Sequence, residues 1–126
     1  FIDQRIVEMG AMLHDIGRCI THSIAHAQEG AALCRRIGIE EPVARIVERH
    51  IGAGLTADEC TLHGLITRDC MPHTAEEKIV AHADNLIAGS RRTTLHETMD
   101  SAYHLSRKIR QRMYRLAREV ETLSNH

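Results

Sequence analysis

The spacing T-x-x-E occurs three times in this sequence, and it constrains the fold more than any other feature. In such a capping box, the threonine side chain and the glutamate three residues later bind backbone N–H groups that the first turn of a helix leaves unpaired. The three pairs are Thr56 with Glu59, Thr74 with Glu77 and Thr94 with Glu97. Only two prolines are present, and no stretch alternates apolar and polar residues in the manner of a strand. The sequence therefore predicts an all-α fold.

Hydrophobic periodicity and these caps place the predicted helices along the chain. Their ranges are about 3–15, 23–37, 42–51, 57–65, 75–89 and 95–123. Gly38 is expected to end the second helix, and Pro42 suits the first turn of the third. Segments 52–56 and 65–73 are expected to be loops.

The chain is long enough for one hydrophobic core, and it contains no repeat, low-complexity segment or linker. We therefore expect a single domain over residues 1–126, with its core at about residues 5–90. The helix predicted at about 95–123 is amphipathic. The expected architecture is a compact multi-helix bundle with this long C-terminal helix.

Aromatic residues make up only 2% of the chain, whereas it contains ten histidines. Few side chains could bind a ligand by stacking, so the chemistry is expected to rest on polar groups and metals. The net charge of −1 favours neither nucleic acid nor membrane as a partner. No apolar run reaches the roughly 18 residues that a membrane-spanning helix needs.

The cysteines Cys19, Cys34, Cys60 and Cys70 are spaced without a C-x-x-C pair. This spacing argues against a structural zinc site and against a thioredoxin-like redox motif. We expect free thiols in a reducing compartment, and therefore a cytoplasmic protein. The chain starts at Phe1, so a removed targeting segment stays open.

Five polar residues stand where the helical pattern calls for apolar ones: His14, Asp15, His26, His50 and Asp84. His14 and Asp15 adjoin at the end of a predicted helix and offer a nitrogen and an oxygen to one point, which suits a divalent transition metal. His26 and His50 each lie on an apolar stripe. Taken singly, such a histidine is more often a packed core residue than a ligand.

Asp84 favours a metal site, because it shares the apolar face of the helix predicted at 75–89. Burying an ionised carboxylate without a partner is costly. The only Lys or Arg in this helix is Lys78, almost two turns away, so a cation from another element or a metal ion must compensate. Two acids and three histidines on inward faces of separate helices favour one shared metal site.

The order of these motifs resembles the HD-domain phosphohydrolase superfamily, and most of all its small stand-alone HDIG-type members from archaea and bacteria. The resemblance covers about residues 5–90 and rests on His14-Asp15-Ile16-Gly17, His26 with Gly30, Arg49-His50, and Asp84-Asn85-Leu86. That family is all-helical and carries the pattern His…His-Asp…His…His…Asp. The resemblance thus implies an HD-domain bundle.

The resemblance also implies a ligand set. His14, Asp15 and Asp84 would bind a first metal ion, and Asp15 would bridge to a second ion held by His26 and His50. One or two divalent transition-metal ions (Mn, Fe, Co, Ni or Zn) are expected. The family's first histidine has no counterpart before His14. We expect it upstream of Phe1, and a natural variant with a weakened first site is the alternative.

The implied activity is metal-dependent hydrolysis of a nucleotide or another small phosphate ester, by a phosphatase or phosphodiesterase. Two metals would activate a hydroxide, which attacks phosphorus in line, and Asp15 is the expected catalytic residue. Candidate substrate-binding residues are Arg18, His22, Lys78, Arg91 and Arg92. Ordinary surface charge is the alternative for the basic residues, and Lys78 and Arg49 could instead pair with glutamates.

The last predicted helix carries an apolar stripe: Leu95, Met99, Ala102, Leu105, Ile109, Met113, Leu116, Val120 and Leu123. The stripe is expected to pack against the domain or against a second copy in a homodimer. Residues 107–118 include six basic residues and no acidic one. A solvated face is expected there; a phosphate or RNA contact is the alternative, but the scarcity of aromatics argues against a stacking platform.

Two other functions stay open. HD-type di-iron proteins include oxygenases, which would require iron-specific, oxygen-dependent turnover. The domain could also be a non-catalytic, metal- or ligand-binding regulatory or dimerisation module. The favoured partner is a small phosphorylated substrate, with no membrane partner and with nucleic acid not favoured.

Overall fold

The computed structural model describes residues 1–88, 91–101 and 106–124. Its α-helices are α1 (Gln4–Leu13), α2 (His26–Arg36), α3 (Glu41–Glu48), α4 (Ala57–Leu62), α5 (Ala75–Asn85), α6 (Leu95–Ser101) and α7 (Arg107–Ser124). The other regular elements are a 3-10 turn, η1 (Ile16–Cys19), and the short strands β1 (Ile87–Ala88) and β2 (Arg91–Arg92). The strands pair antiparallel. Apart from this hairpin of two-residue strands, the regular elements of the described chain are helical. The predicted all-helical fold with a long C-terminal helix is confirmed.

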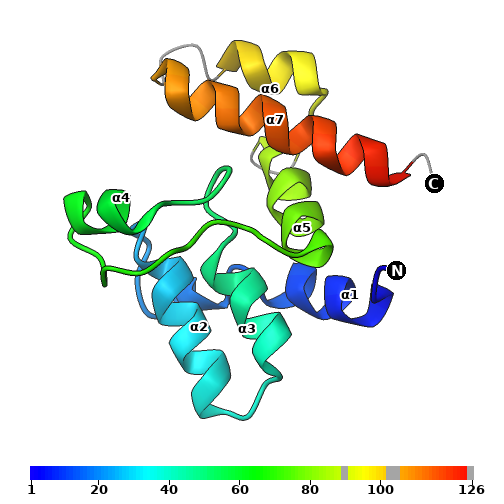
Figure 1. Ribbon diagram of the computed structural model, residues 1–126. Helices are drawn as coiled ribbons and strands as arrows, with labels where there is room; N and C mark the ends of the chain where they lie inside the picture. The colour runs from blue at the N-terminus through cyan, green and yellow to red at the C-terminus, as the bar shows by residue number, and fades with distance from the viewer. Residues whose placement is uncertain (89–90, 102–105, 125–126) are drawn as a thin grey trace.

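Helix α5 joins the two halves of the described chain, because it contacts α1 and α3 on one side and α7 on the other. Figure 1 shows α1, α2 and α3 together below α5, and α6 and α7 above it. Three clusters of buried side chains hold these layers: Ile6, Val43, Ile46 and Val80; Ala31, Cys34, Ala44 and Val47; and Ala53, Ala81, Met113 and Leu116. Small and aliphatic side chains thus build the described core.

Two of the three expected capping boxes form completely. The side chains and backbone N–H groups of Thr56 and Glu59 bind each other reciprocally, and so do those of Thr94 and Glu97. Thr74 accepts from the Glu77 backbone, but the Glu77 carboxylate binds Arg49 and the His73 backbone instead. A buried ion pair has therefore taken the glutamate that the sequence pattern assigned to the cap.

The predicted turn residues also lie as expected. Gly38 follows α2 with a positive φ of 87°, the left-handed conformation that favours glycine. Pro42 lies in the first turn of α3.

The four cysteines are free thiols, and Cys34, Cys60 and Cys70 are buried. Among the described residues, no helix has the length and apolar character of a membrane span.

The expectation of one helix over 95–123 was wrong. Ser106 lies outside both α6 and α7, and its hydroxyl accepts from the backbone N–H of Ile109 at 3.3 Å. This is an N-cap contact, and it starts a new helix. Of the predicted stripe, Met99, Ile109, Met113, Leu116 and Val120 pack in the cluster with Ala53 and Ala81, whereas 102 and 105 lie outside the described residues. This described part of the stripe therefore faces the domain.

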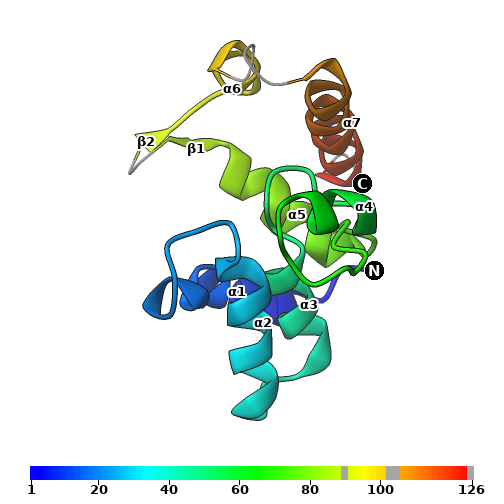
Figure 2. The ribbon, with the colours of Figure 1, turned by 90° about the vertical axis from the view of Figure 1, so that its left-hand side faces the viewer.

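Helix α5 also ends earlier than the predicted residue 89. Its last turn is followed by the hairpin of β1 and β2, which Figure 2 shows leading from α5 toward α6. Thr93 closes this hairpin, because its backbone N–H and its hydroxyl both donate to the Leu86 carbonyl, at 2.6 and 2.9 Å. The carbonyl of Leu86 is thereby bound outside the helix.

Arg112 ties α7 to α4. Its guanidinium donates to both carboxylate oxygens of Glu59 and to the Gly54 carbonyl. Arg112 is the main cause that lowers the pKa of Glu59 to about 2, from an ordinary value of 4.5. The pair therefore stabilises the fold above pH 4.5, and this contribution is lost as the pH falls through about 2.

We predict that Arg112→Gln lowers the free energy of unfolding at pH 6 by about 2 kcal/mol, because it removes charged hydrogen bonds to Glu59. The difference from the wild type should shrink as the pH approaches 2. Urea unfolding at several pH values measures it. Arg36→Gln, on an exposed part of α2, is the control and should change little. A difference that stays constant with pH would contradict the assignment.

Candidate metal centre

The five polar residues of the predicted site lie at the ends of helices. His14 is the C-cap of α1, Asp15 precedes η1, His26 is the first residue of α2, His50 is the second residue after α3, and Asp84 is the last residue but one of α5. The structure brings all five together. Because separate elements supply them, tertiary packing sets their spacing.

Asp15 is at the centre of the group. Its Oδ1 lies 3.2 Å from Nε2 of His26 and 3.4 Å from Nε2 of His50. Its Oδ2 lies 3.3 Å from Nε2 of His14, which in turn is 3.3 Å from Oδ1 of Asp84. The two oxygens of one carboxylate thus face two different sets of partners.

The three histidines share the same backbone contact. Nδ1 of His14 lies 2.7 Å from the Ala11 carbonyl, Nδ1 of His26 lies 2.9 Å from that of Ser23, and Nδ1 of His50 lies 2.7 Å from that of Val47. A carbonyl oxygen can only accept, so in each ring Nδ1 carries the proton and donates. In the neutral state each Nε2 is therefore a free lone pair directed at the centre, as in a metal-binding histidine whose other nitrogen is tied down.

The contact between His26 and His50 is repulsive when both rings are neutral, unless a cation lies between them. Their Nε2 atoms are 3.1 Å apart, although neither has a proton to donate in that tautomer. Two facing lone pairs repel each other, and a proton or a metal cation between them removes the repulsion. Asp15, His26 and His50 offer ligand atoms that all lie within 4.8 Å of one another. This donor set fits a divalent transition metal, which accepts mixed nitrogen and oxygen ligands.

The electrostatics of the site also favour a cation. The nearby Asp84 carboxylate is the main cause that raises the pKa of His14 to about 9. Burial would raise the pKa of Asp15, but the positive charges of nearby groups, His14 first and Arg18 among them, outweigh it and lower that pKa. Burial lowers the pKa of His50, which keeps this ring neutral. The site thus combines a neutral imidazole with carboxylates that attract positive charge.

The carboxylates are more exposed than the sequence argument assumed. The side chains of His26 and His50 are only 6% and 2% exposed, but those of Asp15 and Asp84 are 45% and 35% exposed. The reasoning from a buried Asp84 is therefore corrected, because solvent and His14 both stabilise its charge. Buried nitrogens on one side and accessible oxygens on the other leave the centre open to a ligand.

A cavity of about 200 Å³ adjoins the centre on the side of His14 and Asp84. Its other walls come from apolar residues of α1 and α5 together with Ile87. The metal-binding group thus lies beside an apolar chamber, where an uncharged part of a ligand could be held.

Two glycines allow η1 to pack against α2. A Cβ atom on Gly17 would lie 1.8 Å from the carbonyl oxygen of His26, and a Cβ on Gly30 would lie 2.9 Å from the backbone nitrogen of Gly17. Neither partner is the far end of a flexible side chain. The close approach of η1 to α2 therefore depends on Gly17 and Gly30, and it brings Asp15 to His26.

Of the predicted substrate-binding residues, Arg18 is the one that the structure brings to the centre. Its Nε lies 3.4 Å from Oδ1 of Asp15, and its side chain is 47% exposed. His22 is exposed in the turn before α2, and Arg92 is exposed on β2; neither side chain makes a hydrogen bond or ion pair with the described residues. The side chain of Arg91 lies outside the described structure.

Lys78 is not brought to the centre. Its ammonium group pairs with Glu119 of α7 at 2.6 Å, which was the alternative interpretation of this residue. Six residues separate it from Asp84, or about 9 Å along a helix. Lys78 therefore joins α5 to α7.

Ion pairs hold the site in place. Sequence reasoning allowed a glutamate partner for Arg49 without identifying it, and it missed the pairs of Glu48. The buried Glu77 at the start of α5 binds Arg49, next to His50, at 2.9 Å. The buried Glu48 binds Arg35 at 3.0 Å and Arg68 at 2.8 Å. Glu48 shares a helix with the apolar Val43 and Val47, and that position was its only signal in the sequence. The partners are too far apart in the chain to be paired by spacing.

Comparison with known proteins identifies the same segment. The family model described as HD domain matches residues 1–89. An uncharacterised protein of Methanocaldococcus jannaschii is 49% identical over 98 residues, which cover 78% of this chain and 58% of that protein. The tRNA (cytidine(56)-2′-O)-methyltransferase of Picrophilus torridus is 50% identical over 98 residues, which cover 78% of this chain and 29% of the enzyme.

A more distant relative is the ribonuclease Y of Acidothermus cellulolyticus, which is 32% identical over 102 residues. The match covers 79% of this chain and 17% of that ribonuclease. The chain thus spans less than two thirds of each of these relatives. No solved structure matches it.

We predict that Gly17→Ala destabilises the protein by about 3 kcal/mol or more, because the new methyl group would overlap the His26 backbone. Thermal unfolding measures this loss. Gly64→Ala is the matched control: its Cβ would meet open space, and only its φ of +73° carries a cost of roughly 1–2 kcal/mol. Equal losses in the two variants would show that the close contact at Gly17 is not required.

We also predict that Asp84→Asn lowers the pKa of His14 from about 9 toward 6.5 in the metal-free protein. Because the folded pKa is raised, His14 stabilises the wild type fully below pH 6.5 and loses this contribution as the pH rises through 9. NMR titration of His14 in excess chelator measures the pKa. Asp69→Asn, which alters a contact with His73, is the control and should leave His14 unchanged.

Proposed function

The chain belongs to the HD domain family, and we propose that it is a metal-dependent phosphohydrolase that cleaves a nucleotide or another small phosphate ester. HD domains are typically metal-dependent phosphohydrolases. One observation carries the proposal most directly: three imidazoles, each with Nδ1 bound to a carbonyl, direct Nε2 at a single carboxylate. Such a donor set serves little structural purpose without a cation.

Two groups of residues would hold the ions. His26, His50 and Oδ1 of Asp15 form one group, and His14, Asp84 and Oδ2 of Asp15 form the other. Asp15 is common to both and would bridge two ions. The mixed nitrogen and oxygen ligands suit Mn, Fe, Co, Ni or Zn.

A divalent ion bound here supplies Lewis-acid polarisation of a phosphoryl oxygen and lowers the pKa of a coordinated water toward 7. The chain's own residues would bind and orient the substrate. Arg18, beside Asp15 and half exposed, is placed to neutralise negative charge on the phosphoryl oxygens. The apolar cavity next to His14 would hold the uncharged part of the substrate, such as a nucleobase.

A second candidate substrate is an RNA phosphodiester. According to their names, two of the relatives, ribonuclease Y and the tRNA methyltransferase, act on RNA. Both matches cover more than three quarters of this chain. The same metal-binding residues would serve this substrate, since phosphodiester and phosphomonoester cleavage need the same polarisation of phosphorus.

We predict one or two transition-metal ions per chain in the wild type and a loss of metal in Asp15→Asn, because this carboxylate faces both groups of ligands. Elemental analysis after reconstitution and dialysis measures the stoichiometry. Hydrolysis of p-nitrophenyl phosphate and of bis(p-nitrophenyl) phosphate should fall roughly 100-fold or more in the variant, since even outer ligand partners are worth 10- to 100-fold.

Asp58→Asn, an exposed carboxylate in the first turn of α4, is the matched control and should keep metal and activity. A wild-type chain that stays metal-free after reconstitution would sink the hydrolase proposal and favour a non-catalytic binding module. Metal retained in full by Asp15→Asn would show that the assigned ligand set is wrong.

A further inference from the structure

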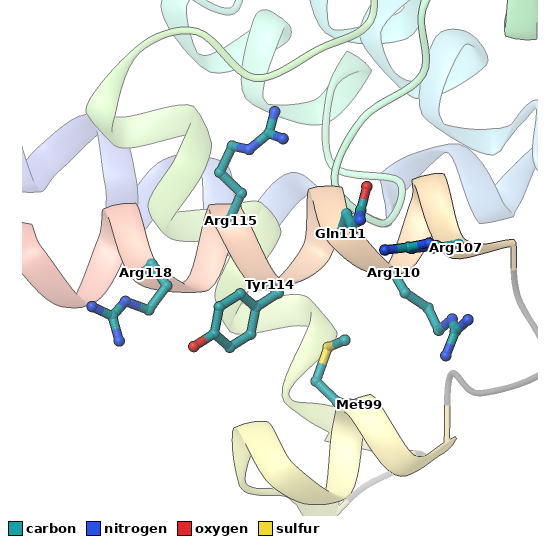
Figure 3. Close-up of a pocket in the computed structure, with 7 residues that line it drawn as sticks. All are labelled: Met99, Arg107, Arg110, Gln111, Tyr114, Arg115 and Arg118. Atoms are coloured by element: carbon teal, nitrogen blue, oxygen red, sulfur yellow. The ribbon is translucent and has the colours of Figure 1, made fainter.

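A groove between α6 and α7 is rich in positive charge. Its volume is about 630 Å³. Four arginines, Gln111 and Tyr114 of α7 line it together with Met99 of α6. Figure 3 shows Met99 directed from α6 toward α7, and the side chains of Arg110, Tyr114 and Arg118 extending toward α6. No carboxylate lines this part of the described chain, although the whole chain has a net charge of −1.

The four groove arginines are Arg107, Arg110, Arg115 and Arg118. None of them forms an ion pair with a described carboxylate. Two acidic residues of α6 and α7 are engaged elsewhere: Glu119 pairs with Lys78 at 2.6 Å and Asp100 with His96 at 3.3 Å. Nε of Arg110 is buried and has no hydrogen-bond partner in the described structure. Buried donors are normally satisfied, so Arg110 is open to an acceptor that the described residues do not supply.

The spacing of the arginines favours an extended anion over a small one. Arg107, Arg110, Tyr114 and Arg118 recur at helical intervals along α7. From Arg107 to Arg118 the helix rises about 16 Å. A nucleic-acid strand advances about 3.4 Å per nucleotide in a duplex and further when extended, so the row spans roughly three to five nucleotides. A mononucleotide could reach only part of it.

Tyr114 adds a surface for a base. Its side chain is 48% exposed and extends from α7 toward α6, between Arg110 and Arg118. Aromatic rings beside a basic groove are the means by which proteins hold single-stranded nucleic acid, because each base can stack on a ring. The scarcity of aromatics had argued against such a platform, but one correctly placed tyrosine supplies it.

We propose that this groove binds single-stranded RNA, with phosphates on the arginines and a base stacked on Tyr114. The phosphate contact rests on the groove itself, whereas the choice of RNA rests on the proposed RNA phosphodiester substrate. A membrane surface does not fit, because the apolar face of α7, with Met113 and Leu116, is buried against the domain. A second copy does not fit either, because two such grooves would repel.

The test measures binding of a fluorescein-labelled single-stranded RNA of about ten uridines, twice the span of the arginine row. Fluorescence anisotropy in excess chelator compares the wild type with the triple variant Arg107→Gln, Arg110→Gln and Arg118→Gln. Loss of three phosphate contacts should weaken binding roughly 100-fold at 0.1 M salt and reduce the salt slope of the affinity by about 2. Circular dichroism checks that the variant is folded.

A matched triple variant removes the same charge elsewhere: Arg5→Gln, Arg36→Gln and Arg45→Gln, all exposed on α1, α2 and α3. It should bind RNA like the wild type. Tyr114→Ala should weaken binding, whereas Tyr114→Phe should preserve it, because the ring alone stacks.

The proposal would be overturned if the two triple variants bound RNA with equal affinity, whether both kept the wild-type affinity or both lost it. Displacement of the RNA by polyglutamate or by phosphatidylserine vesicles as effectively as by unlabelled RNA would point to another partner and overturn it as well. Equal affinity for a DNA of the same length would overturn the choice of RNA. Because binding is measured without metal, its failure leaves the metal centre untouched, and failure of metal binding leaves the groove untouched.

Discussion

The candidate metal centre depends on three hydrogen bonds from histidine rings to backbone carbonyls. The acceptors are Ala11, Ser23 and Val47, each three residues before its histidine. The Ala11 and Val47 carbonyls lie in the last turns of α1 and α3, where carbonyls lack a partner within the helix. The Ser23 carbonyl precedes α2 and also accepts from the backbone N–H of His26. The fold therefore orients each ring and sets its tautomer with its own backbone, and no additional polar side chain is needed for this.

Two glycines allow the close packing between η1 and α2. Gly17 and Gly30 remove the two side chains that would hold these elements apart, and this contact sets the distance from Asp15 to His26. On the other side, the pair of Arg49 with the buried Glu77 ties the end of α3 to the start of α5. The metal-binding atoms thus depend on backbone contacts and ion pairs that never touch the centre themselves.

The sequence was most informative where its signals were local. Capping boxes, Gly38 and the periodic apolar residues predicted the helical fold and most of its helices, because these features act within one turn or two. The helix break at Ser106 was missed, since a lone serine before a basic stretch is a weak start signal beside a continuous apolar stripe. A glutamate partner for Arg49 was an open alternative, but its identity as Glu77 could not be predicted, because the two residues come from different elements.

The same reasoning applies to the candidate site. The five residues could be named from the sequence because each stood out as polar on an apolar face, and the exposure of Asp15 and Asp84 could not, because it depends on what packs beside them. Asn85, the neighbour of Asp84, shows how far that packing extends. Its side chain donates to the Gly52 carbonyl in the loop after His50, and its own carbonyl accepts from Thr98 of α6. One residue of α5 thus connects the loop beside the metal centre to α6, the helix that forms one wall of the basic groove.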